Sequence, residues 1–137
     1  MRRERPPAGS GRVNTYAQNQ RYTPVAQTIK RALESGTLGR VASVSIEFSR
    51  GPHFGGFREE MAYPLILDMS VHHFDLMRFF LGSDAVSVFA RSWNPPSSWL
   101  RGDASGKVSL KLAGGVVASY YIRLFPSRRS RGEPGRG

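Results

Sequence analysis

The 137-residue sequence predicts an α+β fold, a largely antiparallel β-sheet with helices packed on one of its faces. Two observations lead to this class. The first 82 residues carry two helical periodicities, and the remainder carries three strand-like segments with no helix between them. Strands that follow one another without a helix pair antiparallel, because a parallel pair needs a long crossover. The expected order of elements is β-α-β-α-β-β-β.

The first third of the chain predicts a strand, a helix and a second strand. Residues 15–20 are expected to form a short strand, and residues 24–35 form a helix that begins at a proline and ends before Gly36. Apolar and polar residues alternate over 41–48, which predicts the second strand. Residues 50–61 are rich in glycine and are expected to form a long loop with a solvated charged rim.

The longest apolar stretch, residues 64–82, has helical spacing and is apolar on nearly every side. A helix with that pattern is expected to be buried. Three strands are expected after it, over residues 85–93, 104–112 and 116–124. A Gly-Gly pair between the last two predicts a tight hairpin turn.

The net charge of +10 is concentrated at the two ends of the sequence. Eight arginines and two glutamates lie in residues 1–12 and 125–137. Segments of this composition bury too little apolar surface to fold. We therefore expect a disordered basic arm over 1–14, an incomplete α+β domain over 15–124 and a disordered basic tail over 125–137. Basic tails attract polyanions without specificity, so a specific nucleic-acid partner is not expected.

Several function classes are excluded by what the sequence lacks. It has no cysteine, so it has no disulfide framework and no thiolate nucleophile or ligand. It also has no apolar run long enough to span a bilayer and no secretory signal, which predicts a cytoplasmic protein without a membrane partner. A Gly-x-Gly-x-x-Gly motif is absent as well, so this stretch of chain is not expected to bind a nucleotide on its own.

Polar residues interrupt the apolar helix on one face. Asp68, His72 and Asp75 follow a spacing of four and three residues, which places them on the same side. Four interpretations stay open. Asp68 and His72 form a pair for proton transfer; the three residues bind a divalent metal; His72 and His73 form a pH switch; or Asp68 caps the helix and His72 is a hydrogen-bonded core residue.

Three further residues are candidates for ligand binding. Arg21 lies at the junction between the first strand and helix, where its planar guanidinium suits an anion or a hydroxyl-rich ligand. Trp93 and Trp99 flank a proline-rich loop and are candidates to line a polyol or sugar pocket. The alternatives are a solvated turn arginine and aromatic packing over a loop.

Four motifs in order carry a resemblance to a known family. They are Asn19-x-Arg21-Tyr22-x-Pro24, Glu34-Ser-Gly36-x-Leu38-Gly39-Arg40-Val41, Asp68-x-Ser70-x-His72-x-x-Asp75 and the strand at 86–91. With these motifs, residues 15–124 resemble the C-terminal substrate domain of the glucose–fructose oxidoreductase, inositol dehydrogenase and rhizopine-catabolism family (Gfo/Idh/MocA). Two departures are Ala62-Tyr63-Pro64-Leu65 where a glycine run often stands, and Ser70 where glycine is usual.

The resemblance implies an oxidoreductase that uses NAD or NADP and acts on a sugar, a polyol or a related hydroxy or keto compound. It implies that Asp68 orients His72, and that His72 is the acid/base for the substrate hydroxyl. Arg21 and Asp75 are then expected on the substrate side, with Arg21 also near the cofactor. Family domains of this kind associate through the open face of the sheet, so a homo-oligomer is expected.

The same resemblance predicts that this sequence is a fragment. The Rossmann domain that precedes the substrate domain in the family, with its Glu-Lys-Pro lysine, is missing from these residues. We therefore expect no independent hydride transfer, and we expect the missing Rossmann domain to be a partner. The alternative from another class is a basic binding or oligomerisation module without catalysis.

Overall fold

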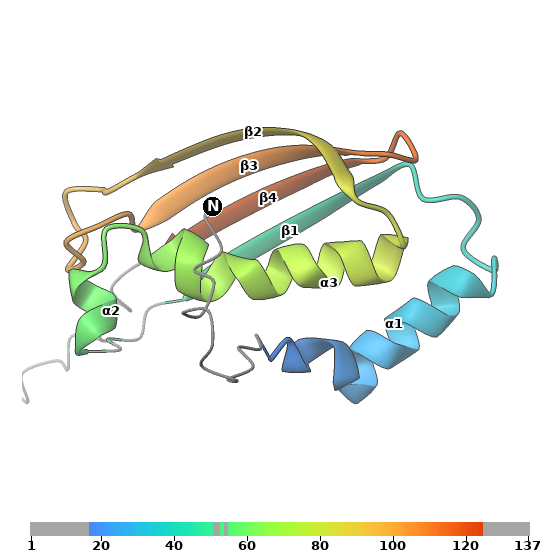
Figure 1. The fold of residues 1–137 in the computed structure, drawn as a ribbon, viewed down its shortest axis with the longest axis horizontal. Helices are drawn as coiled ribbons and strands as arrows, with labels where there is room; N and C mark the ends of the chain where they lie inside the picture. The colour runs from blue at the N-terminus through green and yellow to red at the C-terminus, as the bar shows by residue number, and fades with distance from the viewer. Residues whose placement is uncertain (1–16, 51–52, 54, 125–137) are drawn as a thin grey trace, which may run out of the picture.

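A computed structural model describes residues 17–50, 53 and 55–124, and it has three layers (Figure 1). A β-sheet forms the first layer, helix α3 crosses beneath it, and helix α1 lies outermost. The predicted arm over 1–14, the first two residues of the predicted strand at 15–20 and the predicted tail over 125–137 lie outside the described residues.

The sheet contains four strands in the order β1-β4-β3-β2. Their bounds are β1 (Ser43–Arg50), β2 (Ala85–Trp93), β3 (Ser105–Leu112) and β4 (Val117–Leu124). The consecutive strands β2, β3 and β4 pair antiparallel, as their close spacing in the sequence predicts. Strand β1 pairs with β4 in parallel, and the chain between these two strands runs through α2, α3, β2 and β3. The predicted α+β class, with a largely antiparallel sheet, is confirmed.

The strand predicted over residues 15–20 is wrong for its described part. Asn19–Tyr22 form a short 3-10 helix, η1, in which the Thr23 amide donates to the Gln20 carbonyl at 3.3 Å. A strand requires a neighbouring edge for its backbone groups. This segment instead satisfies them locally while its side chains contact α3. The predicted loop over 50–61 also contains a short helix, α2 (Phe57–Glu60).

Helix α1 (Pro24–Glu34) begins and ends where the sequence predicts. The Thr23 hydroxyl accepts a hydrogen bond from the Ala26 amide at 3.3 Å, and a proline occupies the first turn. The helix ends at Ser35, and Gly36 follows with a φ of 72°, a conformation that glycine adopts without steric cost. Among the described residues, no helix combines the length and the apolar character that crossing a bilayer requires.

The helix predicted over residues 64–82 forms, but its first turns are wider than expected. Leu65–Ser70 form a π-helical segment, η2, which continues directly into α3 (Val71–Leu81). Residues four apart no longer stack in a π turn, because its hydrogen bonds join residues five apart. The expectation of burial on all sides is also wrong, since Leu67 remains 45% exposed.

The core lies between α3 and one face of the sheet. Alternate residues of β3 and β4 point toward the helix, as the strand period of two requires. The buried apolar set comprises Leu65, Met77, Leu100, Ala104, Val108, Leu110, Leu112, Ala118, Tyr120, Ile122 and Leu124. Strand β2 lies beyond the helix layer, and Val86 and Val88 stay more than 60% exposed. Alternate side chains of the opposite sheet face, among them Phe89 and Arg91, line an open depression.

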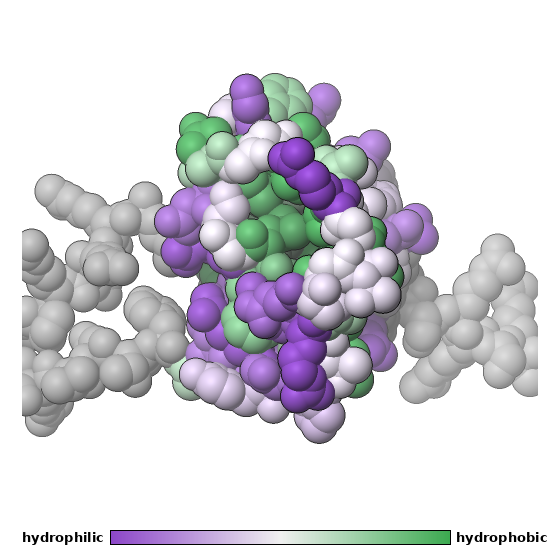
Figure 2. Space-filling view, turned by 90° about the vertical axis from the view of Figure 1, so that its right-hand side faces the viewer, coloured by the Kyte–Doolittle hydropathy of each residue, from purple (hydrophilic) through white to green (hydrophobic). Residues whose placement is uncertain are grey.

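A second, smaller depression lies where α1 approaches the end of α3. It has a volume of about 390 Å³ and an apolar lining that includes Ile29, Leu33, Val41 and Phe80. Figure 2 looks onto this end of the molecule and shows hydrophobic side chains gathered in a hollow. The apolar contact between the two helices is therefore incompletely filled, and the Arg21–Asp75 ion pair adds a polar contact between η1 and α3.

Candidate functional site

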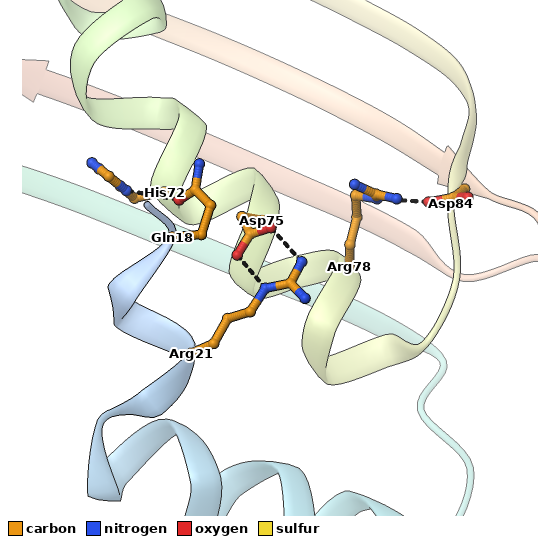
Figure 3. A network of polar contacts seen from close by, with 6 residues as sticks. All are labelled: Gln18, Arg21, His72, Asp75, Arg78 and Asp84. Atoms are coloured by element: carbon orange, nitrogen blue, oxygen red, sulfur yellow. Dashed lines mark hydrogen bonds and ion pairs between the residues drawn. The ribbon is translucent and has the colours of Figure 1, made fainter. Parts of the chain in front are cut away.

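His72 lies on the side of α3 that faces η1. Its ring is half-buried, and Nδ1 lies 2.8 Å from the side-chain oxygen Oε1 of Gln18 (Figure 3). Gln18 is the residue immediately before η1. Since Nδ1 and Nε2 lie on opposite sides of an imidazole, the second ring nitrogen points away from Gln18. One nitrogen is thus engaged by Gln18, and the other is directed away from that partner.

Arg21 and Asp75, both predicted substrate-binding residues, bind each other. Arg21 donates from Nε and Nη2 to the two carboxylate oxygens of Asp75 (Figure 3). The guanidinium also lies 5.5 Å from the centre of the Phe79 ring. The hydrogen bond to Asp75 raises the pKa of Arg21. In this arrangement the pair fastens η1 onto α3, since a bidentate ion pair fixes orientation as well as distance.

Asp68 bonds to a different partner from the one that the sequence predicts. Its Oδ2 accepts a hydrogen bond from Arg58 Nε at 2.7 Å. Asp68 lies in the π-helical segment and His72 in α3, so the two residues stand on either side of the change in helical pitch. In the structure, Asp68 therefore bonds to Arg58, and His72 bonds to Gln18. The catalytic roles of Asp68 and His72 stay predictions.

Arg58 bonds to a candidate site residue, although the sequence predicts it on the solvated rim of the loop. It comes from α2, which the loop after β2 holds in place. The Arg101 amide donates to the Glu59 carbonyl at 3.0 Å, and Arg101 Nη1 donates to Glu60 at 2.7 Å. No local pattern could have found the Arg58–Asp68 contact, because it depends on how the glycine-rich loop folds back.

The structure does not bring the two tryptophans to His72. Trp93 lies with Phe89 and Arg91 in the depression on the sheet face opposite α3. Trp99 lies in the loop after β2, packs against the core and stacks on His53 with ring centres 4.2 Å apart. Its indole Nε1 is buried without a hydrogen-bond partner among the residues that the structure describes. Their roles in substrate binding stay predictions.

A buried polar network joins α3 to the centre of the sheet. His73 Nδ1 lies 2.8 Å from the Tyr120 hydroxyl, and that hydroxyl donates to Ser70 Oγ at 3.0 Å. Burial raises the pKa of Tyr120 to about 12. Burial also lowers the pKa of His73 below its usual 6.5, and the nearby charge of His72 adds to that shift. The alternation of β4 places Tyr120 in the core, where a tyrosine hydroxyl needs a partner.

The lowered pKa of His73 predicts a loss of stability in mild acid. The unfolded chain binds a proton on this imidazole more readily than the folded chain does, so stability falls as pH drops below about 6.5. We expect a lower urea midpoint at about pH 5.5 than at about pH 7.5, values on either side of the usual imidazole pKa. A His73→Gln variant cannot titrate and should lose part of this pH dependence. Equal pH dependence in the two proteins would contradict the assignment.

The structure gives no support to the metal interpretation. Within residues 17–50, 53 and 55–124, no three His, Asp or Glu side chains gather closely enough to hold an ion. Asp68, His72 and Asp75 bond to three different partners, Arg58, Gln18 and Arg21.

Similar proteins were found by sequence and by structure. The chain is 34% identical over 73 residues to inositol 2-dehydrogenase of Rhizobium meliloti, a match that covers 53% of this chain and 22% of the relative. An Agrobacterium radiobacter oxidoreductase, crystallised with NAD+, L-tartaric acid and magnesium, superposes with a TM-score of 0.73 at 22% identity, over 86% of this chain and 35% of that one. A Bordetella pertussis dehydrogenase in complex with NADH and UDP-GlcNAcA superposes with a TM-score of 0.65 at 16% identity, over 82% and 36%.

The curated relatives are longer proteins. The chain spans only 22–30% of their length. The two superpositions show that the fold is shared. The family model described as GFO/IDH/MocA C-terminal domain matches residues 26–131, which is most of the sequence. The chain therefore belongs to the Gfo/Idh/MocA family of oxidoreductases and carries its C-terminal domain.

Proposed function

We propose that this chain supplies the substrate-side domain of an NAD(P)-dependent oxidoreductase that acts on a sugar, a polyol or a related hydroxy or keto compound. The observation that carries the proposal is the His72 imidazole, half-buried on α3 with one nitrogen bonded and the other directed away from its partner. An imidazole changes charge near neutral pH, which suits it to exchange a proton with a hydroxyl group. The family membership supplies the reaction class.

His72 has the role of acid/base in this proposal. Its free nitrogen accepts the proton of a substrate hydroxyl, and in the reverse direction it returns the proton to a carbonyl oxygen. Proton removal makes hydride loss from the same carbon easier, so a positioned base contributes about 10²–10⁴-fold to such a step. Asp68, with its carboxylate held by Arg58, is proposed as the second polar group of the site.

The residues of this chain do not by themselves fit a dinucleotide. The sequence has no Gly-x-Gly-x-x-Gly motif, and Arg21, the one predicted cofactor contact, is engaged by Asp75. A nicotinamide held beside this domain by another domain would supply hydride acceptance, and the chain's own residues would handle the proton. We propose a Rossmann domain as the partner that holds the dinucleotide. The outer side of η1 and α1, where Tyr22 and Val25 are 79% and 69% exposed, offers that domain apolar surface.

The proposed substrate class rests on the names of the similar proteins. One relative is an inositol dehydrogenase, and the solved neighbours hold tartaric acid and a nucleotide sugar acid. All three compounds carry hydroxyl groups on carbon. The common chemistry is therefore a secondary alcohol, which an imidazole base can deprotonate.

A homo-oligomer is proposed to form through the open face of the sheet. This face has a broad depression of about 960 Å³, lined by residues that include Phe89, Trp93, Lys107 and Tyr121. Phe89 is 77% exposed, which is unusual for a phenylalanine unless another surface covers it. In this proposal Trp93 lies either in the contact between the two copies or in a binding site that this contact completes.

The experiment joins a dinucleotide-binding domain of the family upstream of this chain and measures reduction of NAD and NADP. We expect turnover with at least one polyol or sugar, and none with the matching compound whose reacting hydroxyl has been removed. The chain alone is the control and should show no turnover. If the joined protein binds dinucleotide but oxidises no compound of this class, the proposed function is wrong.

A further inference from the structure

The contact between Gln18 and His72 determines which ring nitrogen carries hydrogen. The atom of Gln18 that faces Nδ1, at 2.8 Å, is the amide oxygen Oε1. An amide oxygen has only lone pairs, so with the amide in this orientation the imidazole nitrogen is the donor. Neutral His72 therefore carries its hydrogen on Nδ1 and leaves a lone pair on Nε2.

Polar contacts of η1 hold Gln18 in place. The Arg21–Asp75 ion pair ties η1 to α3, and Gln27 Nε2 donates to the Arg21 carbonyl at 2.7 Å from the following helix. Arg21 also lies over the Phe79 ring. These contacts fix the backbone three residues after Gln18, and the Gln18 side chain itself is half-buried. Its reach to His72 is thus set by the packing of η1 on α3 (Figure 3).

We propose that Gln18 is a positioning residue that holds His72 as the Nδ1–H tautomer with Nε2 ready to accept a proton. The catalytic meaning of this inference rests on the proposed function, whereas the tautomer itself does not. Because Asp68 is occupied by Arg58, the partner of His72 is a neutral amide rather than a carboxylate. The amide oxygen orients the ring through this one hydrogen bond.

The test observes the His72 ring nitrogens directly by ¹H–¹⁵N NMR of the 137-residue chain, at a pH where the imidazole is neutral. We expect a protonated Nδ1 and a bare Nε2 in the wild-type chain. Gln18→Leu should shift hydrogen toward Nε2, whereas Gln18→Glu keeps an acceptor oxygen at the same reach and should keep the wild-type tautomer. Gln20→Leu makes the same change at an exposed position of η1 and should leave the spectrum unchanged.

Two results would overturn the inference. The first is a wild-type spectrum in which Nε2 carries the hydrogen, and this result needs no variant to fold. The second is a folded Gln18→Leu variant whose His72 nitrogens match those of the wild type.

A second measurement separates this inference from the proposed function. In the joined oxidoreductase, Gln18→Leu should lower kcat about 10–100-fold, as loss of an orienting partner does, with little change in KM. Gln18→Glu should restore most of the loss, because it restores an acceptor. A wild-type joined protein without turnover would contradict the proposed function while the NMR result stands. A tautomer that moves in Gln18→Leu while kcat stays at the wild-type level would refute the positioning role.

Discussion

Replacing His72 with alanine is expected to lower kcat of the joined oxidoreductase by about 10²–10⁴-fold, the usual contribution of a positioned acid/base. The loss should fall on kcat more than on KM, because proton transfer stabilises the transition state and adds little to substrate binding. The folded structure should survive the change. His72 is half-buried rather than part of the apolar core, and its described hydrogen bond is to a single side chain, Gln18.

Two controls make this result specific to proton transfer. Imidazole added to the buffer should restore part of the activity of His72→Ala, since the truncated side chain leaves room beside α3. Gln20→Ala, at an exposed position of η1, should keep wild-type kcat. Wild-type activity in His72→Ala would remove His72 from the mechanism, and a large loss without rescue by any base would point to a positioning role instead.

The regular elements were predictable because local periodicity determines them. Strand β2 forms over Ala85–Trp93, as its β-branched and aromatic content predicts, and β3 and β4 begin within one residue of their predicted positions. The helix α1 follows from its capping threonine and proline. Local patterns fail where a segment depends on a distant partner. Asn19–Tyr22 form a 3-10 helix, and its Arg21 binds Asp75, which lies 54 positions away.

The candidate site illustrates the same limit. The spacing of Asp68 and His72 correctly places both residues on one continuous helical segment. It does not show that the first part of this segment is a π turn, which changes how the two residues lie relative to each other. It also contains no sign of Gln18, whose contact with His72 exists only after η1 packs on α3. A sequence thus identifies candidate functional side chains more readily than the residues to which they hydrogen-bond.

Gly102 is expected to be the least replaceable glycine of the described chain, and Gly102→Ala should lower the free energy of unfolding by about 3 kcal/mol. A Cβ atom at this position would lie 2.2 Å from the Ala62 carbonyl oxygen and 2.3 Å from that of Met61. Both atoms belong to the backbone, so no side-chain rotation relieves the overlap. The loop must move away, which weakens the hydrogen bond from the Asp103 amide to the Ala62 carbonyl, now 3.2 Å long.

Gly114→Ala is the matched control for this prediction. A Cβ atom there would meet nothing within 4 Å, so the same substitution should change stability by less than about 0.5 kcal/mol. Urea unfolding followed by circular dichroism compares the two variants with the wild type. Because Arg101 and Asp103 hold the segment that carries Arg58, the displacement in Gly102→Ala should also loosen the Arg58–Asp68 pair. Equal midpoints for Gly102→Ala and Gly114→Ala would show that the close approach of the two backbone segments is not needed for the fold.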